Sequence, residues 1–121
     1  MLVCWIDTER CDATIEDVKG TLQDYYRMTH CEAIDIATRT VEGTPFNIVV
    51  DDEGILRDDP KFSVYDMDGR PNLAGSVVVC GMADLEGNMT GLTEDDVDLL
   101  DSHLMLLTVE GERDRPILIV D

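Results

Sequence analysis

The chain has 121 residues, of which 27 are Asp or Glu and nine are Lys or Arg, so its formal net charge is −18 at pH 7. This length fits a single domain, residues 1–121, and leaves no room for a second hydrophobic core. The acidity excludes direct binding to nucleic acid and disfavours anionic membranes, because both ligands require a basic surface.

The composition otherwise resembles that of an ordinary folded protein. A hydrophobic content of 44% argues against disorder despite the high charge. No stretch has the pattern of a signal peptide or the length of a membrane span, so we expect a cytoplasmic protein. The four cysteines lack paired spacing, which predicts reduced thiols.

The first part of the chain predicts a strand followed by a helix. Residues 2–6 are apolar and rich in strand formers. Thr14 then has the character of a helix cap, with Asp17 three residues later in the position of a capping box. Because apolar residues from Ile15 onward recur at helical spacing, we place this helix at about 14–28.

The middle of the chain is dominated by strand patterns. Four segments are apolar or alternate between apolar and polar residues, and turn residues separate them: 33–38, 46–50, 62–66 and 73–80. Gly75, within the last and strongest segment, suggests a bulge.

The last part predicts a second helix and a final strand. Thr93 caps the helix with Asp96 in the box position, and its apolar stripe includes Leu100 and Leu104. The segment Pro116–Val120 is apolar and suits a strand. The whole order predicts an α+β fold, with an antiparallel or mixed sheet of about five to six strands and two helices packed on one face.

Motifs for catalysis or for a cofactor are weak, so we expect a non-enzymatic protein without a cofactor. His30-Cys31-Glu32 matches the His-x-Glu of zinc deaminases, but the downstream Pro-Cys-x-x-Cys of those enzymes is missing. Asp66-x-Asp68-Gly69 resembles the start of a calcium loop, yet Pro71 stands where an EF-hand requires glycine, which favours a solvated turn. A zinc site remains open as an alternative, assembled from Cys4, Cys11, His30 and Cys31.

Three short motifs occur in a fixed order along the chain. They are the turn Asp51-Asp52-Glu53-Gly54, the strand 74–81 and the helix start 91–96. In this order and spacing, over about residues 14–105, the chain resembles a family catalogued as domain of unknown function 3846, and the strand after Gly111 looks like an addition to it. The family is frequent in bacteriophages and integrative elements, and no catalytic residues are assigned to it. The resemblance therefore implies an accessory protein of a phage or mobile element.

Because such accessory proteins often act against host defences, we expect a counter-defence inhibitor of the anti-CRISPR or anti-restriction kind. Its carboxylates would mimic the phosphates of DNA in the basic channel of a host nucleic-acid-binding protein or defence effector. The predicted binding residues are acids of two loops and one helix: Asp51, Asp52, Glu53, Asp58, Asp59, Glu94, Asp95, Asp98 and Asp101.

Two alternatives remain beside the DNA mimic. In the first, the acidity is background and the protein binds another protein through a different surface. In the second, it binds a nucleotide signal through cationic and aromatic groups that nothing groups in the sequence: Arg39, Arg57, Arg70, Trp5 and the tyrosines. A separate expectation concerns assembly, because an exposed apolar strand at Pro116–Val120 would pair between chains and form a homodimer.

Overall fold

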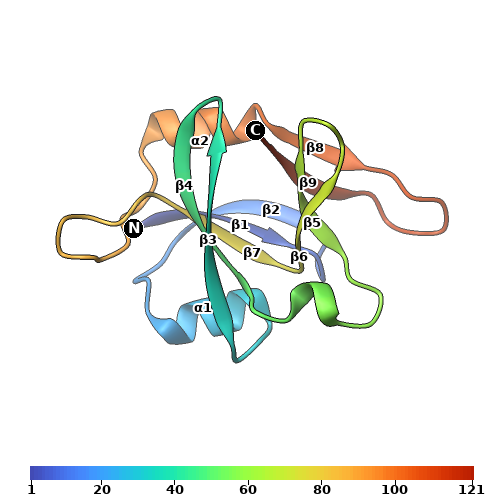
Figure 1. The fold of residues 1–121 in the computed structure, drawn as a ribbon, viewed down its shortest axis with the longest axis horizontal. Helices are drawn as coiled ribbons and strands as arrows, with labels where there is room; N and C mark the ends of the chain where they lie inside the picture. The colour runs from blue at the N-terminus through green and yellow to red at the C-terminus, as the bar shows by residue number, and fades with distance from the viewer.

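The computed structural model describes all 121 residues, which form two β-sheets, two α-helices and one short 3₁₀ turn (Figure 1). Sheet A contains β1 (Leu2–Asp7), β2 (Asp12–Asp17), β3 (Ile34–Val41), β4 (Thr44–Asp51) and β7 (Val77–Cys80). Sheet B contains β5 (Phe62–Asp66), β6 (Pro71–Ala74), β8 (Leu104–Leu107) and β9 (Arg115–Val120). The remaining elements are α1 (Leu22–Thr29), η1 (Gly54–Leu56) and α2 (Glu94–Asp101).

The strand order is β2-β1-β7-β4-β3 in sheet A and β6-β5-β9-β8 in sheet B. Every neighbouring pair is antiparallel except β5 and β9, which are parallel. The prediction of an α+β fold with antiparallel and mixed sheets is therefore confirmed, although the strands form two sheets rather than one.

The two helices lie on opposite faces of sheet A. The inner face of sheet A packs against sheet B and α2 in a cluster that includes Phe46, Val64 and Leu100. The outer face packs against α1 through Trp5 and Met28. The expectation that both helices share one face is not confirmed, because the central strands of sheet A are apolar on both sides and both sides need cover.

The first helix starts later than the sequence suggested. Residues 12–17 form β2, which pairs with β1 along its whole length. The helix cap is Thr21, whose side chain accepts the N–H of Asp24, while the Asp24 carboxylate accepts the N–H of Thr21. The prediction of a helix at 14–28 is wrong at its start, since pairing with β1 outweighs the cap pattern at Thr14.

The strand predicted at 73–80 is divided between the two sheets. Its first half belongs to β6 in sheet B and its second half is β7 in sheet A. Gly75 lies at the crossing with φ of +86°, a left-handed conformation that glycine adopts easily. Gly75 is therefore a corner between sheets, and the prediction of a bulge within one strand is wrong.

The last part of the chain combines confirmed and corrected predictions. Thr93 and Asp96 form the predicted capping box. The helix ends at Asp101, however, and Leu104 begins β8 because residues 104–107 pair with β9. Strand β9 lies between β5 and β8, so it has no free edge, and the expectation that Pro116–Val120 pairs between chains is wrong. Neither α-helix, at eight residues each, is long and apolar enough to cross a membrane.

Candidate functional site

Helix α2 carries a dense group of carboxylates without basic partners. Its eight residues include no Lys, Arg or His, and five of them are acidic: Glu94, Asp95, Asp96, Asp98 and Asp101. None of these five forms an ion pair. Acids in the first turn interact favourably with the positive end of the helix dipole, so the helix forms without basic partners.

The acids around η1 have a different environment. Asp51 is only 7% exposed, and its carboxylate accepts hydrogen bonds from Arg57 Nε at 2.5 Å and from the N–H of Glu53 at 2.9 Å. Burial acts to raise the pKa of Asp51, but these hydrogen bonds outweigh burial and hold the pKa below its ordinary value. Asp59 pairs with Lys61 at 3.2 Å. The exposed acids of this region without an ion pair are Asp52, Glu53 and Asp58.

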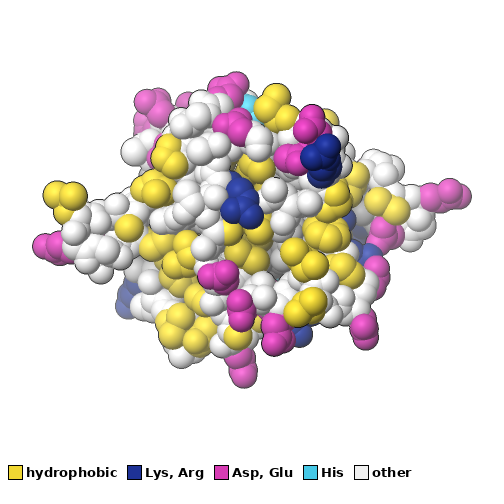
Figure 2. All heavy atoms as spheres, in the orientation of Figure 1, with side chains coloured by type: hydrophobic (Ala, Val, Ile, Leu, Met, Phe, Trp, Pro, Cys, Tyr) yellow, Lys and Arg dark blue, Asp and Glu magenta, His cyan; other side chains and the backbone are white.

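The nine predicted binding residues do not share one surface. Figure 1 places α2 and η1 at opposite sides of the molecule. In the same orientation, Figure 2 shows acidic side chains scattered over this face, most of them toward its edges, and hydrophobic side chains across its middle. The acids of α2 and those near η1 therefore form two separate groups.

A groove of about 170 Å³ separates α2 from β2. Its floor is mainly apolar and includes Cys4, Ile15 and Val97, while Asp98 and Asp101 line its helical side. Burial raises the pKa of the Cys4 thiol to about 12, and the nearby charge of Asp101 acts in the same direction. The groove thus combines an apolar floor with negative charge along one edge.

A second group of charged side chains gathers where β1 ends. The Asp7 side chain is 1% exposed, and its Oδ2 accepts a hydrogen bond from Arg10 Nε at 2.8 Å. Its Oδ1 accepts the Glu9 N–H at 3.0 Å and the Ser76 hydroxyl at 3.1 Å, and His30 Nε2 lies 3.0 Å from the same oxygen. Burial acts to raise the pKa of Asp7, but these hydrogen bonds, led by that of His30, outweigh burial and hold the pKa below its ordinary value.

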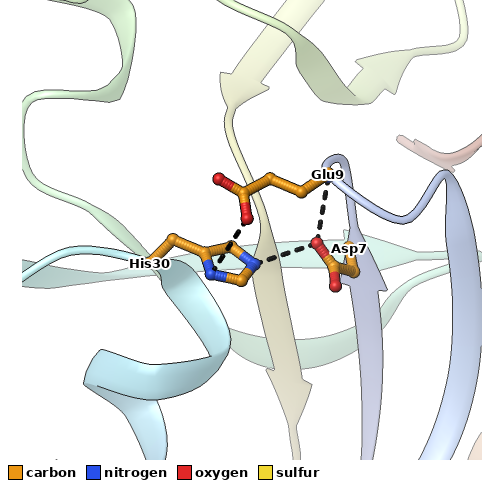
Figure 3. Close-up of side chains that lie close together, drawn as sticks. All are labelled: Asp7, Glu9 and His30. Atoms are coloured by element: carbon orange, nitrogen blue, oxygen red, sulfur yellow. Dashed lines mark hydrogen bonds and ion pairs between the residues drawn. The ribbon is translucent and has the colours of Figure 1, made fainter.

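His30 reaches this carboxylate because α1 ends in a left-handed turn. The backbone of His30 has φ of 56° and ψ of 36°, and its N–H donates to the carbonyl of Tyr26. This conformation costs a residue with a Cβ roughly 1–2 kcal/mol. The turn directs the imidazole between two carboxylates, with Nε2 facing Asp7 and Nδ1 lying 3.3 Å from Glu9 Oε2 (Figure 3).

A polar hollow of about 150 Å³ lies beside this cluster, and no hydrophobic residue lines it. Glu9, His30 and Ser76 contribute to it, and Asp51 and Arg57 also line it. Two sets of charged side chains therefore meet at this hollow. One contains Glu9 and His30 from the ends of β1 and α1, and the other is the pair Asp51 and Arg57. Sequence reasoning identified Asp51, but it missed the role of Asp7 and Glu9.

The four side chains considered for zinc do not come together. Cys4 is buried between the sheets, whereas Cys31 hydrogen-bonds with the Thr29 hydroxyl and the Ala33 carbonyl. The group of possible metal ligands that the fold does assemble is Asp7, Glu9 and His30. The predicted zinc site is therefore wrong for its three cysteines. Of its four residues, only His30 belongs to the group of possible metal ligands.

The groups considered for a nucleotide are dispersed as well. Arg39 hydrogen-bonds the Asn72 side chain at 2.7 Å, whereas Arg57 lies in the polar hollow. Trp5 instead lies beneath Arg10, with 4.2 Å between the guanidinium carbon and the ring centroid. No single pocket unites these side chains.

Comparison with protein families gives one result. A family model described as "Domain of unknown function (DUF3846)" matches residues 1–105. The chain belongs to the DUF3846 family. Comparisons with curated proteins and with solved structures give no match.

The DUF3846 match contains both candidate sites. It includes the Asp7–Glu9–His30 cluster and the whole of α2, and it ends inside β8. Strand β9 lies outside the match, as the sequence suggested, but in this structure it is an internal strand of sheet B rather than an appendage.

Proposed function

We propose that this DUF3846 protein is a non-enzymatic binding protein of a phage or mobile element, which acts in the host cytoplasm as a counter-defence inhibitor. Its target is a nucleic-acid-binding defence enzyme, and α2 provides the binding surface. The observation that carries the proposal is the group of five α2 carboxylates, none of which has a basic partner. Such carboxylates are free to pair with the Lys and Arg residues of a phosphate-binding channel.

The spacing of these acids favours a linear contact. Glu94, Asp98 and Asp101 lie at positions i, i+4 and i+7, so they follow one flank of the helix. Successive carboxylates along this flank are separated by about 4.5–6 Å of helix rise. A row of negative charges at this spacing is suited to a partner that tracks a phosphate backbone.

The groove between α2 and β2 adds a reason for preferring basic protein side chains as the ligand. Lys and Arg have apolar stems and charged heads. The floor that includes Ile15 and Val97 fits the stem, and Asp98 and Asp101 lie where the charged head would be. The acids near η1 are weaker candidates, because Asp51 already pairs with Arg57 inside the fold.

The test is capture of host proteins by the tagged wild type and by two variants with equal net charge. In one variant, Asp98→Asn and Asp101→Asn neutralise the groove. In the other, Glu110→Gln and Asp114→Asn neutralise two exposed acids outside α2. We expect the wild type and the second variant to capture a basic nucleic-acid enzyme that is released by salt and by added DNA.

The first variant should lose that capture. Equal capture by both variants, or capture that persists at about molar salt, would contradict an electrostatic DNA mimic centred on α2. Inhibition of the captured enzyme by the wild type, and its absence for Asp98→Asn/Asp101→Asn, then connects binding with function.

A further inference from the structure

The ends of β1 and α1 bring three possible metal ligands together. One ligand atom from each of Asp7, Glu9 and His30 lies within 4.8 Å of the other two. Figure 3 shows His30 Nε2 directed at the Asp7 carboxylate, while the Glu9 carboxylate lies beside the ring with its Oε2 3.3 Å from Nδ1. Because a carboxylate oxygen is an acceptor, the contact of 3.0 Å between His30 Nε2 and Asp7 Oδ1 needs either a hydrogen on the nitrogen or a metal ion bound to both atoms.

The separation of the ligand atoms suits a cation. The distance from His30 Nε2 to Asp7 Oδ1 is 3.0 Å. Two adjacent ligands of a six-coordinate ion with bonds of about 2.1 Å are also separated by about 3.0 Å, so an ion beside the line between these two atoms can bind both once the imidazole turns toward it. Glu9 is 66% exposed, and rotation of its side chain brings its carboxylate to the same ion.

The ligands are also supported by neighbouring groups. Arg10 Nε donates to the free oxygen of Asp7, while the Ser76 hydroxyl and the Glu9 N–H donate to Oδ1. Hydrogen bonds of this kind hold a ligating carboxylate in place and are typical of protein metal sites. His30 is fixed by the left-handed turn that ends α1.

The geometry points to a binding site for one divalent first-row metal ion, such as Mn²⁺, held by Asp7, Glu9 and His30. Two carboxylates and one imidazole form a ligand set that suits ions between the hard and soft extremes. Binding of the ion replaces the hydrogen bond between His30 and Asp7, and water completes the coordination of the ion. The site is separate from the α2 groove, so it does not depend on the proposed function.

The test is titration of the whole chain with Mn²⁺ in about 0.15 M salt, with the free ion measured by electron paramagnetic resonance. The wild type is expected to bind one ion per chain tightly, with a nitrogen hyperfine coupling from a directly bound imidazole. Glu9→Gln and His30→Ala are each expected to weaken binding by about tenfold or more, and His30→Ala to remove the nitrogen coupling.

His103→Ala is the matched control, because His103 Nε2 faces the Glu42 carboxylate at 3.5 Å but belongs to no group of three possible metal ligands. This variant should bind Mn²⁺ as the wild type does. Glu9→Gln keeps the test valid if His30→Ala fails to fold, since the Glu9 side chain is exposed. Binding without nitrogen coupling, or equal affinity in the wild type and in both site variants, overturns the proposal and assigns the ion to surface carboxylates.

Discussion

The indole Nε1 of Trp5 donates a hydrogen bond to the carbonyl of Met28 at 2.8 Å, which joins the middle of sheet A to the end of α1. This bond is buried, so a carbonyl that loses its donor there remains without a partner. We expect Trp5→Phe to lower the free energy of unfolding by about 1–3 kcal/mol, measured by urea denaturation followed by circular dichroism. Tyr65→Phe serves as the control because the Tyr65 hydroxyl makes no hydrogen bond, and equal stability of the two variants would contradict the prediction.

Asp7 predicts a specific dependence of stability on pH. Its pKa in the folded protein lies below the ordinary value of 3.8, since hydrogen bonds outweigh burial. The charged carboxylate therefore stabilises the fold fully above that ordinary value, and the stabilisation is lost as pH falls through the lower folded pKa. Asp7→Asn should cost about 2–4 kcal/mol at pH 7, and the difference from the wild type should narrow below about pH 4. Urea midpoints measured for both proteins between neutral and acid pH test this, and a constant difference would refute it.

The two helix caps can be compared with a threonine that only resembles one. Thr21→Ala and Thr93→Ala should each lower stability by about 1 kcal/mol, because each removes the acceptor of a backbone N–H in a capping box. Thr14→Ala should change stability by less than about 0.5 kcal/mol, since Thr14 lies on β2 and its hydroxyl bonds only to the Glu16 side chain. A larger effect at Thr14 than at Thr21 would favour a helix that starts at residue 14.

The part played by β9 can be measured at Leu118. This side chain is 1% exposed and belongs to the core between the two sheets. We expect Leu118→Ala to cost about 2–5 kcal/mol by leaving a cavity. Leu56→Ala, at a side chain that is 84% exposed, should be close to neutral. If the two variants unfold at the same urea concentration, the last strand is an appendage.

The order of elements could be predicted only where local signals agree with tertiary contacts. Thr93 and Asp96 form the capping box of a helix that no strand competes for, so their pattern was sufficient. Thr14 and Thr21 both have an Asp three residues later, and only the pairing of β2 with β1 decides between them. The sequence also could not show that a strand divides at Gly75, because the run of apolar residues continues in both sheets.

The candidate sites differ in the same way. The acids of α2 lie within eight residues of sequence, and their grouping follows from helix geometry alone. The Asp7–Glu9–His30 cluster joins residues more than 20 positions apart, and it exists because α1 ends in a left-handed turn beside β1. The one local signal was Asp7-x-Glu9 directly after an apolar strand, which is uninformative in a chain with 27 acids.

The position of β9 also affects how the protein is made. Sheet B cannot be completed until residues 115–120 have left the ribosome, because β9 is the shared partner of β5 and β8. Until then the inner face of sheet A, which includes Phe46 and Val79, is only partly covered in the nascent chain. Shorter translation products should therefore bind chaperones or be degraded, and only chains that reach about residue 120 should escape this quality control.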